Sequence, residues 1–192
     1  MRVILASKSP RRRELLGEIF EKFEIITSDA DESLSADIHP REGVRILAVR
    51  KGEGVAKENP DALVISSDTL VELDGVPLGK PRDEKDAANM LRALSGNTHR
   101  VHTGVAVHYN GRVLDGVDTT AVIFREISDA EIEEYIASGE PMDKAGAYGI
   151  QGGAALFAQR LEGDYFNVVG LPLCRLHQML TKLAPELMED IL

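Results

Sequence analysis

Hydrophobic and polar positions divide the chain into short apolar runs and longer amphipathic stretches. A continuous apolar run such as Val3 to Ala6 is typical of a strand buried on both faces. Apolar residues three and four positions apart, such as Leu15, Leu16 and Ile19, form one face of a helix. The pattern predicts strands at 3–6, 23–27, 62–67, 99–109, 112–125 and 155–161, and helices from 10 onward and at 40–57, 81–94, 128–138 and 171–183. This alternation predicts an α/β fold.

Turn residues separate these elements. Asp74-Gly75 and Asn110-Gly111 predict tight hairpin turns, because both pairs tolerate positive φ. Ser9, just before Pro10, predicts the N-cap of the first helix. Residues 144–153 are rich in Gly and Ala and predict a shaped loop, and the last nine residues are expected to fray. No repeat or linker divides the chain, so we expect a single domain over residues 1–192.

Composition narrows the classes of function. The 192 residues include 22 Lys plus Arg and 32 Asp plus Glu, a formal charge of −10, which argues against nucleic acid or an anionic membrane as the main partner. The sequence has no apolar run long enough to cross a membrane. The apolar run of the opening segment, Val3 to Ala6, is too short for a signal-peptide core, so we expect a cytoplasmic protein. Cys174 is the single cysteine, which excludes an internal disulfide; we expect it in the core.

Three arginines, residues 11–13, occupy the first turn of the first predicted helix. The helix dipole disfavours cations there, so this placement indicates an anion to be bound. At 100° per residue Arg12 faces the core side, which makes it the first candidate for a phosphate contact, with Arg11 second and Arg13 on the surface. The alternative interpretation is a solvated basic turn.

Acidic residues and lysines supply further candidates. Asp68 follows a predicted strand, and ligands of open α/β sheets bind at the carboxyl ends of strands, where a carboxylate can bind a metal or take a proton. A turn-capping Asp is the alternative. The loop acids Asp31-Glu32 could hold Mg²⁺. Lys51 and Lys80 are weaker candidates for binding an anion.

Several of these residues belong to longer blocks. The segment LASKSPRRRELL at 5–16 resembles the opening signature of the Maf family of nucleoside triphosphate pyrophosphatases. Later blocks match in order: SDT at 67–69, GKP at 79–81, SGNTH at 95–99, DKAGAYGIQG at 143–152 and VVGLPL at 168–173. The resemblance covers nearly the whole chain. It implies an α/β fold with an elongated central mixed sheet, helices on both sides and an active-site cleft between two lobes.

The resemblance also implies an activity: metal-dependent hydrolysis of a nucleoside triphosphate to the monophosphate and pyrophosphate. By this resemblance Asp68 is the catalytic base, and Glu32 lies near the metal, Mg²⁺ or Mn²⁺. The positions that match the family's phosphate-handling residues are Ser9, Arg12, Lys51 and Lys80.

Three positions point to a branch of the family. The branch acting on dTTP and UTP carries Arg, Thr and Gln where the 7-methyl-GTP branch carries Trp, Gln and Glu, and here these positions read Arg11, Thr69 and Gln151. The segment DKAG at 143–146 supports the same branch. A Gln amide can both donate to and accept from a pyrimidine edge, whereas a carboxylate only accepts.

Two alternatives stay open. One is a pyrophosphatase for modified purine nucleotides or 7-methyl-GTP. The other is a nucleotide-binding regulator of septum formation with little catalysis, since the family is associated with arrest of cell division. Whether the substrate is dTTP/UTP or a purine nucleotide, the expected partner is a nucleoside triphosphate. We expect neither nucleic acid nor a membrane as a partner, and a homodimer is left open.

Overall fold

The computed structural model describes residues 1–27, 29–35 and 37–187. Within this part of the chain seven strands form one sheet in the order β2-β1-β3-β5-β6-β7, with β4 paired to β3 off that path. The pairs β1–β2 and β1–β3 are parallel and the others antiparallel, so the sheet is mixed, as expected. The strands are β1 Val3–Leu5, β2 Glu24–Ile25, β3 Leu63–Leu73, β4 Val76–Leu78, β5 Thr98–Tyr109, β6 Arg112–Phe124 and β7 Ala158–Glu162.

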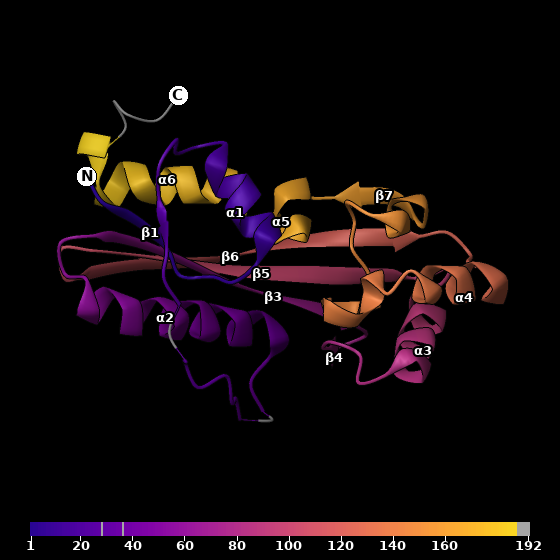
Figure 1. Cartoon of the computed structure of the whole chain (residues 1–192). Coiled ribbons are helices and arrows are strands. Elements are labelled where there is room, and N and C mark those ends of the chain that lie inside the picture. Colours follow the sequence, from indigo (N-terminus) through magenta and orange to yellow (C-terminus); the bar gives the residue numbers. More distant parts are fainter. Residues whose placement is uncertain (28, 36, 188–192) are drawn as a thin grey trace.

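Helices cover both faces of the sheet (Figure 1). One face is covered by α2 (Pro40–Glu58), and the other by α1 (Pro10–Gly17), α5 (Tyr165–Val169) and α6 (Leu173–Leu183). At one end of the long strands, α3 (Glu84–Leu94) packs against α4 (Asp129–Ala137). Beside them lie the 3-10 turns η1 (Glu140–Asp143) and η2 (Ala145–Ala147), followed by η3 (Gly153–Leu156) and, near the C-terminus, η4 (Pro185–Leu187). This arrangement corresponds to the two lobes that the family resemblance implies.

The apolar run at 62–67 is buried on both faces, because β3 lies in the middle of the sheet. Val64 belongs to a small apolar cluster with Val55 of α2, whereas its neighbour Ile65 belongs to the larger cluster on the opposite face. Successive strand residues point to opposite faces, so a continuous apolar run is what such a position requires. The prediction of a doubly covered strand is confirmed.

The extent of β3 differs from the prediction. We expected the strand to end near Ser67 and Asp68 to follow it, but β3 continues to Leu73 because its pairing with β5 does not stop there; Asp68 lies opposite Gly104. The pairing with β1 does stop, at Leu5 opposite Ile65. Asp68 therefore lies beyond the end of the neighbouring parallel strand while staying inside its own strand.

Smaller differences have local causes. α3 begins at Glu84 rather than Pro81, because Asp83 caps it by accepting a hydrogen bond from the Asp86 amide at 2.7 Å. β7 begins at Ala158 because η3 precedes it, and the five-residue α5 is too short to show helical periodicity. Cys174 is exposed, not in the core as expected, because the buried side of α6 is formed by Leu176, Met179, Leu180 and Leu183.

Both hairpin turns are confirmed. φ is positive at Asp74 and Gly75 (51° and 81°) and at Asn110 and Gly111 (50° and 71°). Of the last nine residues, 185–187 form η4, and the expectation of fraying at 188–192 falls outside the described residues. Among the helices that the structure describes, none has the length and apolar character needed to cross a membrane.

Candidate active site

The edge of β3 has a gap between its two partners. β1 pairs with β3 as far as Ile65, and β4 pairs with it from Val71 onward. Between them the edge of β3 faces a cleft of about 1100 Å³, whose lining includes the segments that follow β1 and β4. The cleft is also lined by α2, the loop at 29–32, the turns at 143–150 and the end of α5. Elements of both lobes therefore meet at this gap.

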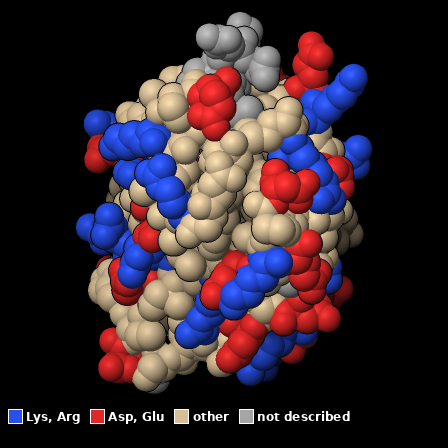
Figure 2. All heavy atoms as spheres, turned by 90° about the vertical axis from the view of Figure 1, so that its left-hand side faces the viewer, with Lys and Arg blue, Asp and Glu red and all other residues tan. Residues whose placement is uncertain are grey.

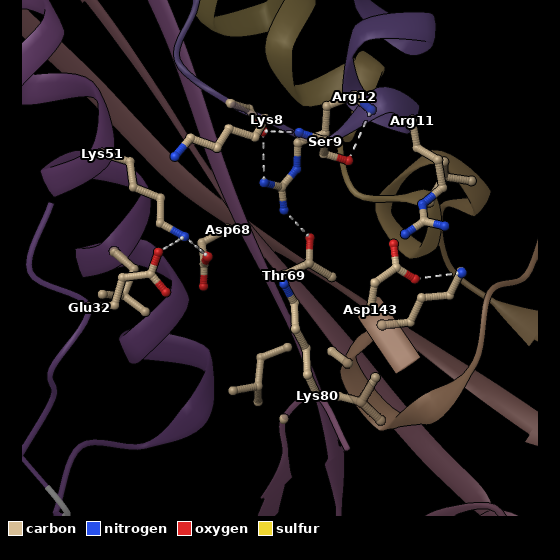
Figure 3. A pocket seen from close by; sticks show the side chains of 18 of the residues that line it. Lys8, Ser9, Arg11, Arg12, Glu32, Lys51, Asp68, Thr69, Lys80 and Asp143 are labelled. Atoms are coloured by element: carbon tan, nitrogen blue, oxygen red, sulfur yellow. Dashed lines mark hydrogen bonds and ion pairs between the residues drawn. The ribbon is translucent and has the colours of Figure 1, made fainter. Parts of the chain in front are cut away.

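Two carboxylates meet one ammonium group in the cleft. Lys51 Nζ lies 2.5 Å from Asp68 Oδ1 and 3.0 Å from Glu32 Oε1 (Figure 3). Asp68 and Lys51 are mostly buried, with side chains 14% and 20% exposed, whereas Glu32 is 65% exposed. A short, poorly solvated ion pair of this kind holds the carboxylate of Asp68 in one position.

Close packing of α2 on the sheet brings Lys51 to Asp68. Gly104 of β5 lies opposite Asp68, and a Cβ atom built on Gly104 would lie 2.2 Å from the carbonyl oxygen of Val44. The backbone of α2 therefore rests directly on β5 at this point. Lys51 lies four residues after Leu47, whose side chain is buried and also lines the cleft. This spacing keeps Lys51 on the sheet side of the helix.

Arg12 ties together the segments around the gap. Its Nε donates to the carbonyl of Gly170 at 2.8 Å, and Nη1 donates to the carbonyl of Ser67 at 2.8 Å and to Ser7 Oγ at 3.3 Å. Nη2 donates to Thr69 Oγ1 at 2.9 Å. Burial lowers the pKa of Arg12, the charge of Asp68 opposes that shift, and the guanidinium stays protonated. Arg12 points to the core side, as predicted, and its donors serve protein oxygens at the wall of the cleft.

Thr69 continues this hydrogen-bond chain. Its Oγ1 lies 3.0 Å from Thr103 Oγ1, and Thr103 donates its own proton to the carbonyl of Asn167 at 2.7 Å. Thr69 must therefore donate to Thr103 while it accepts from Arg12. Asp68 and Thr69 point to opposite faces of β3, and both reach the cleft because the gap in the sheet edge opens it to both faces.

The remaining basic and polar candidates lie around the same cleft. Ser9 caps α1, accepting from the backbone amide of Arg12 at 3.5 Å. Arg11 and Lys80 line the cleft, and so does Lys8, which the sequence does not single out. Arg13 is exposed, as predicted.

One predicted site residue lies apart from the others. Gln151 is exposed and does not line the cleft in this structure, although its neighbours Gly149 and Ile150 do. The structure brings together the other predicted residues, namely Ser9, Arg11, Arg12, Glu32, Lys51, Asp68, Thr69 and Lys80. It adds Asp143 and Lys144, whose only sequence signal is their place in the block at 143–152.

The carboxylates fit a divalent cation shared with a ligand. Asp68 and Glu32 converge on one centre of positive charge, the ammonium of Lys51. Among the described residues no cluster of three or more His, Cys, Asp or Glu side chains is arranged to hold a metal. Mg²⁺ is commonly held by one or two carboxylates together with water and substrate phosphates, so a pair suffices.

Fold and cleft together define a class: an α/β protein with a mixed sheet whose cleft combines several cations with paired carboxylates, an arrangement suited to an anionic ligand carrying a metal ion. The family follows from comparison with known proteins. Residues 2–183 match the family model described as Maf-like protein, and the chain belongs to this family.

Relatives match over most of the chain. A dTTP/UTP pyrophosphatase of Alkaliphilus metalliredigens (strain QYMF) is 50% identical over 185 residues, covering 94% of this chain and 95% of the relative. A dTTP/UTP pyrophosphatase of Geobacillus sp. (strain WCH70) is 53% identical over 174 residues, covering 90% and 93%. Among solved structures, the Staphylococcus aureus Ham1 protein aligns with a TM-score of 0.47 and 20% identity, over 67% of this chain and 73% of that one.

Proposed function

We propose that the protein is a cytoplasmic, metal-dependent pyrophosphatase that hydrolyses dTTP and UTP to the nucleoside monophosphate and pyrophosphate. The observation that carries this proposal is the convergence of Asp68 and Glu32 on one cationic position in a cleft lined with further cations. Relatives about half identical to this chain bear the name dTTP/UTP pyrophosphatase, which supports the nucleotide specificity.

Substrate binding requires local positive charge. A nucleoside triphosphate carries about four negative charges, and the chain as a whole has a formal charge of −10, which repels it at long range. Lys8, Lys51 and Lys80 line the cleft, and the N-terminus of α1 adds its partial positive charge. We assign phosphate binding to Ser9, Arg12, Lys51 and Lys80, with Arg12 also ordering the wall of the cleft through its four hydrogen bonds.

The reaction needs a water molecule activated next to the phosphates. Asp68 is the proposed base: as water attacks phosphorus, the new P–O bond forms, a proton passes to the Asp68 carboxylate, and the anhydride bond between the α- and β-phosphates breaks, so that pyrophosphate leaves. Lys51 orients Asp68 before the reaction through the 2.5 Å contact. A divalent cation held by Asp68 and Glu32 would neutralise phosphate charge.

The nucleobase requires separate recognition. We assign it to Arg11, Thr69 and Gln151, the positions at which the family's branches differ. Arg11 and Thr69 line the cleft. Gln151 follows directly after Ile150, which also lines it, so a small rearrangement of this exposed turn would bring the amide to the cleft.

The first test is pyrophosphate release from dTTP, UTP, CTP, 7-methyl-GTP and ITP, with Mg²⁺, with Mn²⁺ and with chelator. We expect dTTP and UTP to be cleaved selectively and only with metal. Asp68→Asn should lower kcat about 10²- to 10⁴-fold, the usual contribution of a general base, with a modest change in nucleotide binding. Asp61→Asn is the matched control, because Asp61 is exposed at the turn before β3 and does not line the cleft.

The outcomes are distinct. Full activity of Asp68→Asn would remove the base assignment. Cleavage confined to 7-methyl-GTP or ITP would keep the chemistry and contradict the assignment of Arg11, Thr69 and Gln151. Nucleotide binding with no cleavage of any substrate would favour a regulator of septum formation.

A further inference from the structure

A second charged group lines the cleft away from Asp68. It consists of Arg11 at the start of α1 and of Asp143 and Lys144 at the end of η1. The side chains of Arg11 and Asp143 point toward one another, on the far side of Thr69 from the Lys51–Asp68 pair (Figure 3). Asp143 lies apart from Asp68 and Glu32, the pair proposed to hold the metal, and a carboxylate with no metal between it and a phosphate repels that phosphate. This part of the cleft is therefore suited to a less charged part of the ligand.

The polar atoms of this group are held in defined positions. Lys144 Nζ donates to the carbonyl of Glu140 at 2.5 Å and to Asp143 Oδ1 at 2.8 Å, and its side chain is only 10% exposed. Gly149 packs directly on it, since a Cβ there would lie 2.6 Å from Lys144 Cε. Glu140 in turn accepts from Tyr135 Oη at 3.0 Å and from the Gly153 amide at 3.0 Å, which fixes the turn that carries Lys144.

The charge states of this group are also defined. The hydrogen bond from Lys144 and the nearby charges of Lys144 and Arg11 keep the pKa of Asp143 below its ordinary value. Asp143 is therefore an acceptor at neutral pH, between two groups that can only donate. Asp143 lies between the Lys144 ammonium, which donates to its Oδ1, and the Arg11 guanidinium, which points toward it, so this group offers a donor, an acceptor and a donor (Figure 3).

This order complements one class of nucleobase. Uracil and thymine present an acceptor, a donor and an acceptor along the edge O4, N3–H and O2, whereas cytosine presents a donor and two acceptors. We propose that Asp143 and Lys144 are specificity-determining residues, with Asp143 accepting from N3–H and Lys144 donating to a ring carbonyl, beside Arg11. Cytosine would place its N3 lone pair against the Asp143 carboxylate. The inference rests on the proposed function, because it concerns the base of the same substrate.

The test compares UTP with CTP. In Asp143→Asn the amide can turn its N–H toward the base, which removes the repulsion of cytosine N3 and weakens the acceptor for uracil N3–H. We expect the ratio of kcat/KM for UTP over CTP to fall about 10-fold or more, as for loss of one base-edge hydrogen bond. Lys144→Met, which keeps the length of the side chain, should lower the same ratio mainly through KM. Asp61→Asn is the control and should leave the ratio unchanged.

Equilibrium binding of non-hydrolysable α,β-methylene analogues of UTP and CTP gives a readout that does not depend on turnover. A lowered UTP/CTP affinity ratio in Asp143→Asn supports the inference. An unchanged ratio in a folded Asp143→Asn variant overturns it, as does a wild-type protein that binds both analogues equally. Absence of pyrophosphate release by the wild type would overturn the proposed function, and the binding ratio would still decide the role of Asp143.

Discussion

Arg12 shows how one residue connects sequence and site. A cation in the first turn of a helix is opposed by the helix dipole, so the sequence alone predicts an anion bound there, and this stays a prediction. The structure supplies four oxygens for Arg12: two backbone carbonyls and two hydroxyls, contributed by three separate segments of the chain. The periodicity of α1 predicts the direction of Arg12, but not these partners, because three of the four come from β3 and from the residue after α5, and only Ser7 lies near α1 in the chain.

We expect Arg12→Lys to be nearly as damaging as Arg12→Ala. An ammonium cannot reproduce the forked pattern of donors, so at least one carbonyl, of Ser67 or Gly170, would lose its partner, at a cost of about 1–3 kcal/mol in the free energy of unfolding. KM should rise and kcat should fall, lowering kcat/KM by about 10-fold or more. Urea unfolding and pyrophosphate release measure both effects.

The exposed Arg13 provides the control for this experiment. Arg13→Ala removes the same charge one residue away and should change stability by less than about 0.5 kcal/mol. If Arg12→Lys unfolds at the same urea concentration as the wild type, Arg12 does not organise the wall of the cleft.

At the scale of elements, the packing of α2 on β5 determines the distance between Lys51 and Asp68. The two residues lie on different elements, and Gly104 is the point at which those elements touch through their backbones. A hydrophobicity pattern predicts that α2 packs on the sheet, but it does not specify how closely. That distance depends on a position without a side chain on a strand far away in the sequence.

Gly104→Ala tests this contact. The added methyl group would meet the Val44 carbonyl and force α2 away from β5, with an expected loss of about 1–3 kcal/mol in the free energy of unfolding. Because Asp68 lies opposite Gly104 and Lys51 is carried by α2, kcat should fall as well. Gly17→Ala is the control, since a Cβ at Gly17 meets nothing within 4 Å. Equal kcat values for the two variants would show that the α2–β5 spacing does not set the geometry of the site.

The boundaries of β3 depend on more than its local sequence. The start of β3 was predictable from its apolar run, but its continuation through Asp68 and Thr69 to Leu73 depends on pairing with β5. Polar residues inside a strand resemble a strand end when they are read in isolation. Here the gap between β1 and β4 accommodates them, because their side chains open into the cleft.

At the scale of the whole molecule, charge is spread rather than segregated. At the end that carries the N-terminus, Lys and Arg side chains are interspersed with Asp and Glu (Figure 2). A formal charge of −10 therefore does not gather into one acidic face on this side of the protein. Capture of an anionic substrate depends on the local cations of the cleft, because charges further away than about 8–10 Å are screened at physiological salt.

Stability of the molecule should depend on pH through His99. His99 of β5 is buried, its Nε2 lies 2.8 Å from Tyr148 Oη, and its Nδ1 has no partner among the described residues. Burial lowers the pKa of His99 to about 4, from 6.5. The unfolded chain therefore binds a proton between these values that the folded chain does not. The contribution of neutral His99 to stability is present above pH 6.5 and is lost as the pH falls toward 4. Between pH 7 and pH 5 the free energy of unfolding should fall by about 2 kcal/mol through this residue.

Urea unfolding of the wild type and of His99→Gln at pH 7 and pH 5 measures this effect. Glutamine can keep a hydrogen bond to Tyr148 but does not titrate, so the variant should lose about 2 kcal/mol less than the wild type over this interval. The carboxylates and the other histidines contribute to both proteins and cancel in the comparison. Identical losses in both proteins would contradict a neutral, buried His99.

The sequence by itself determined the α/β class, most of the helices and strands, the hairpin turns and the family resemblance, because these depend on local periodicity, turn chemistry and contiguous blocks. It also pointed to Arg12, Asp68 and Lys51 as chemistry-bearing residues, whose roles stay predictions. Only the tertiary structure decided that Asp68 lies inside a strand, that Asp68 and Glu32 converge on Lys51, and that Asp143 faces Arg11 in the cleft. These facts depend on pairing and packing between segments distant in the chain, which no local pattern records.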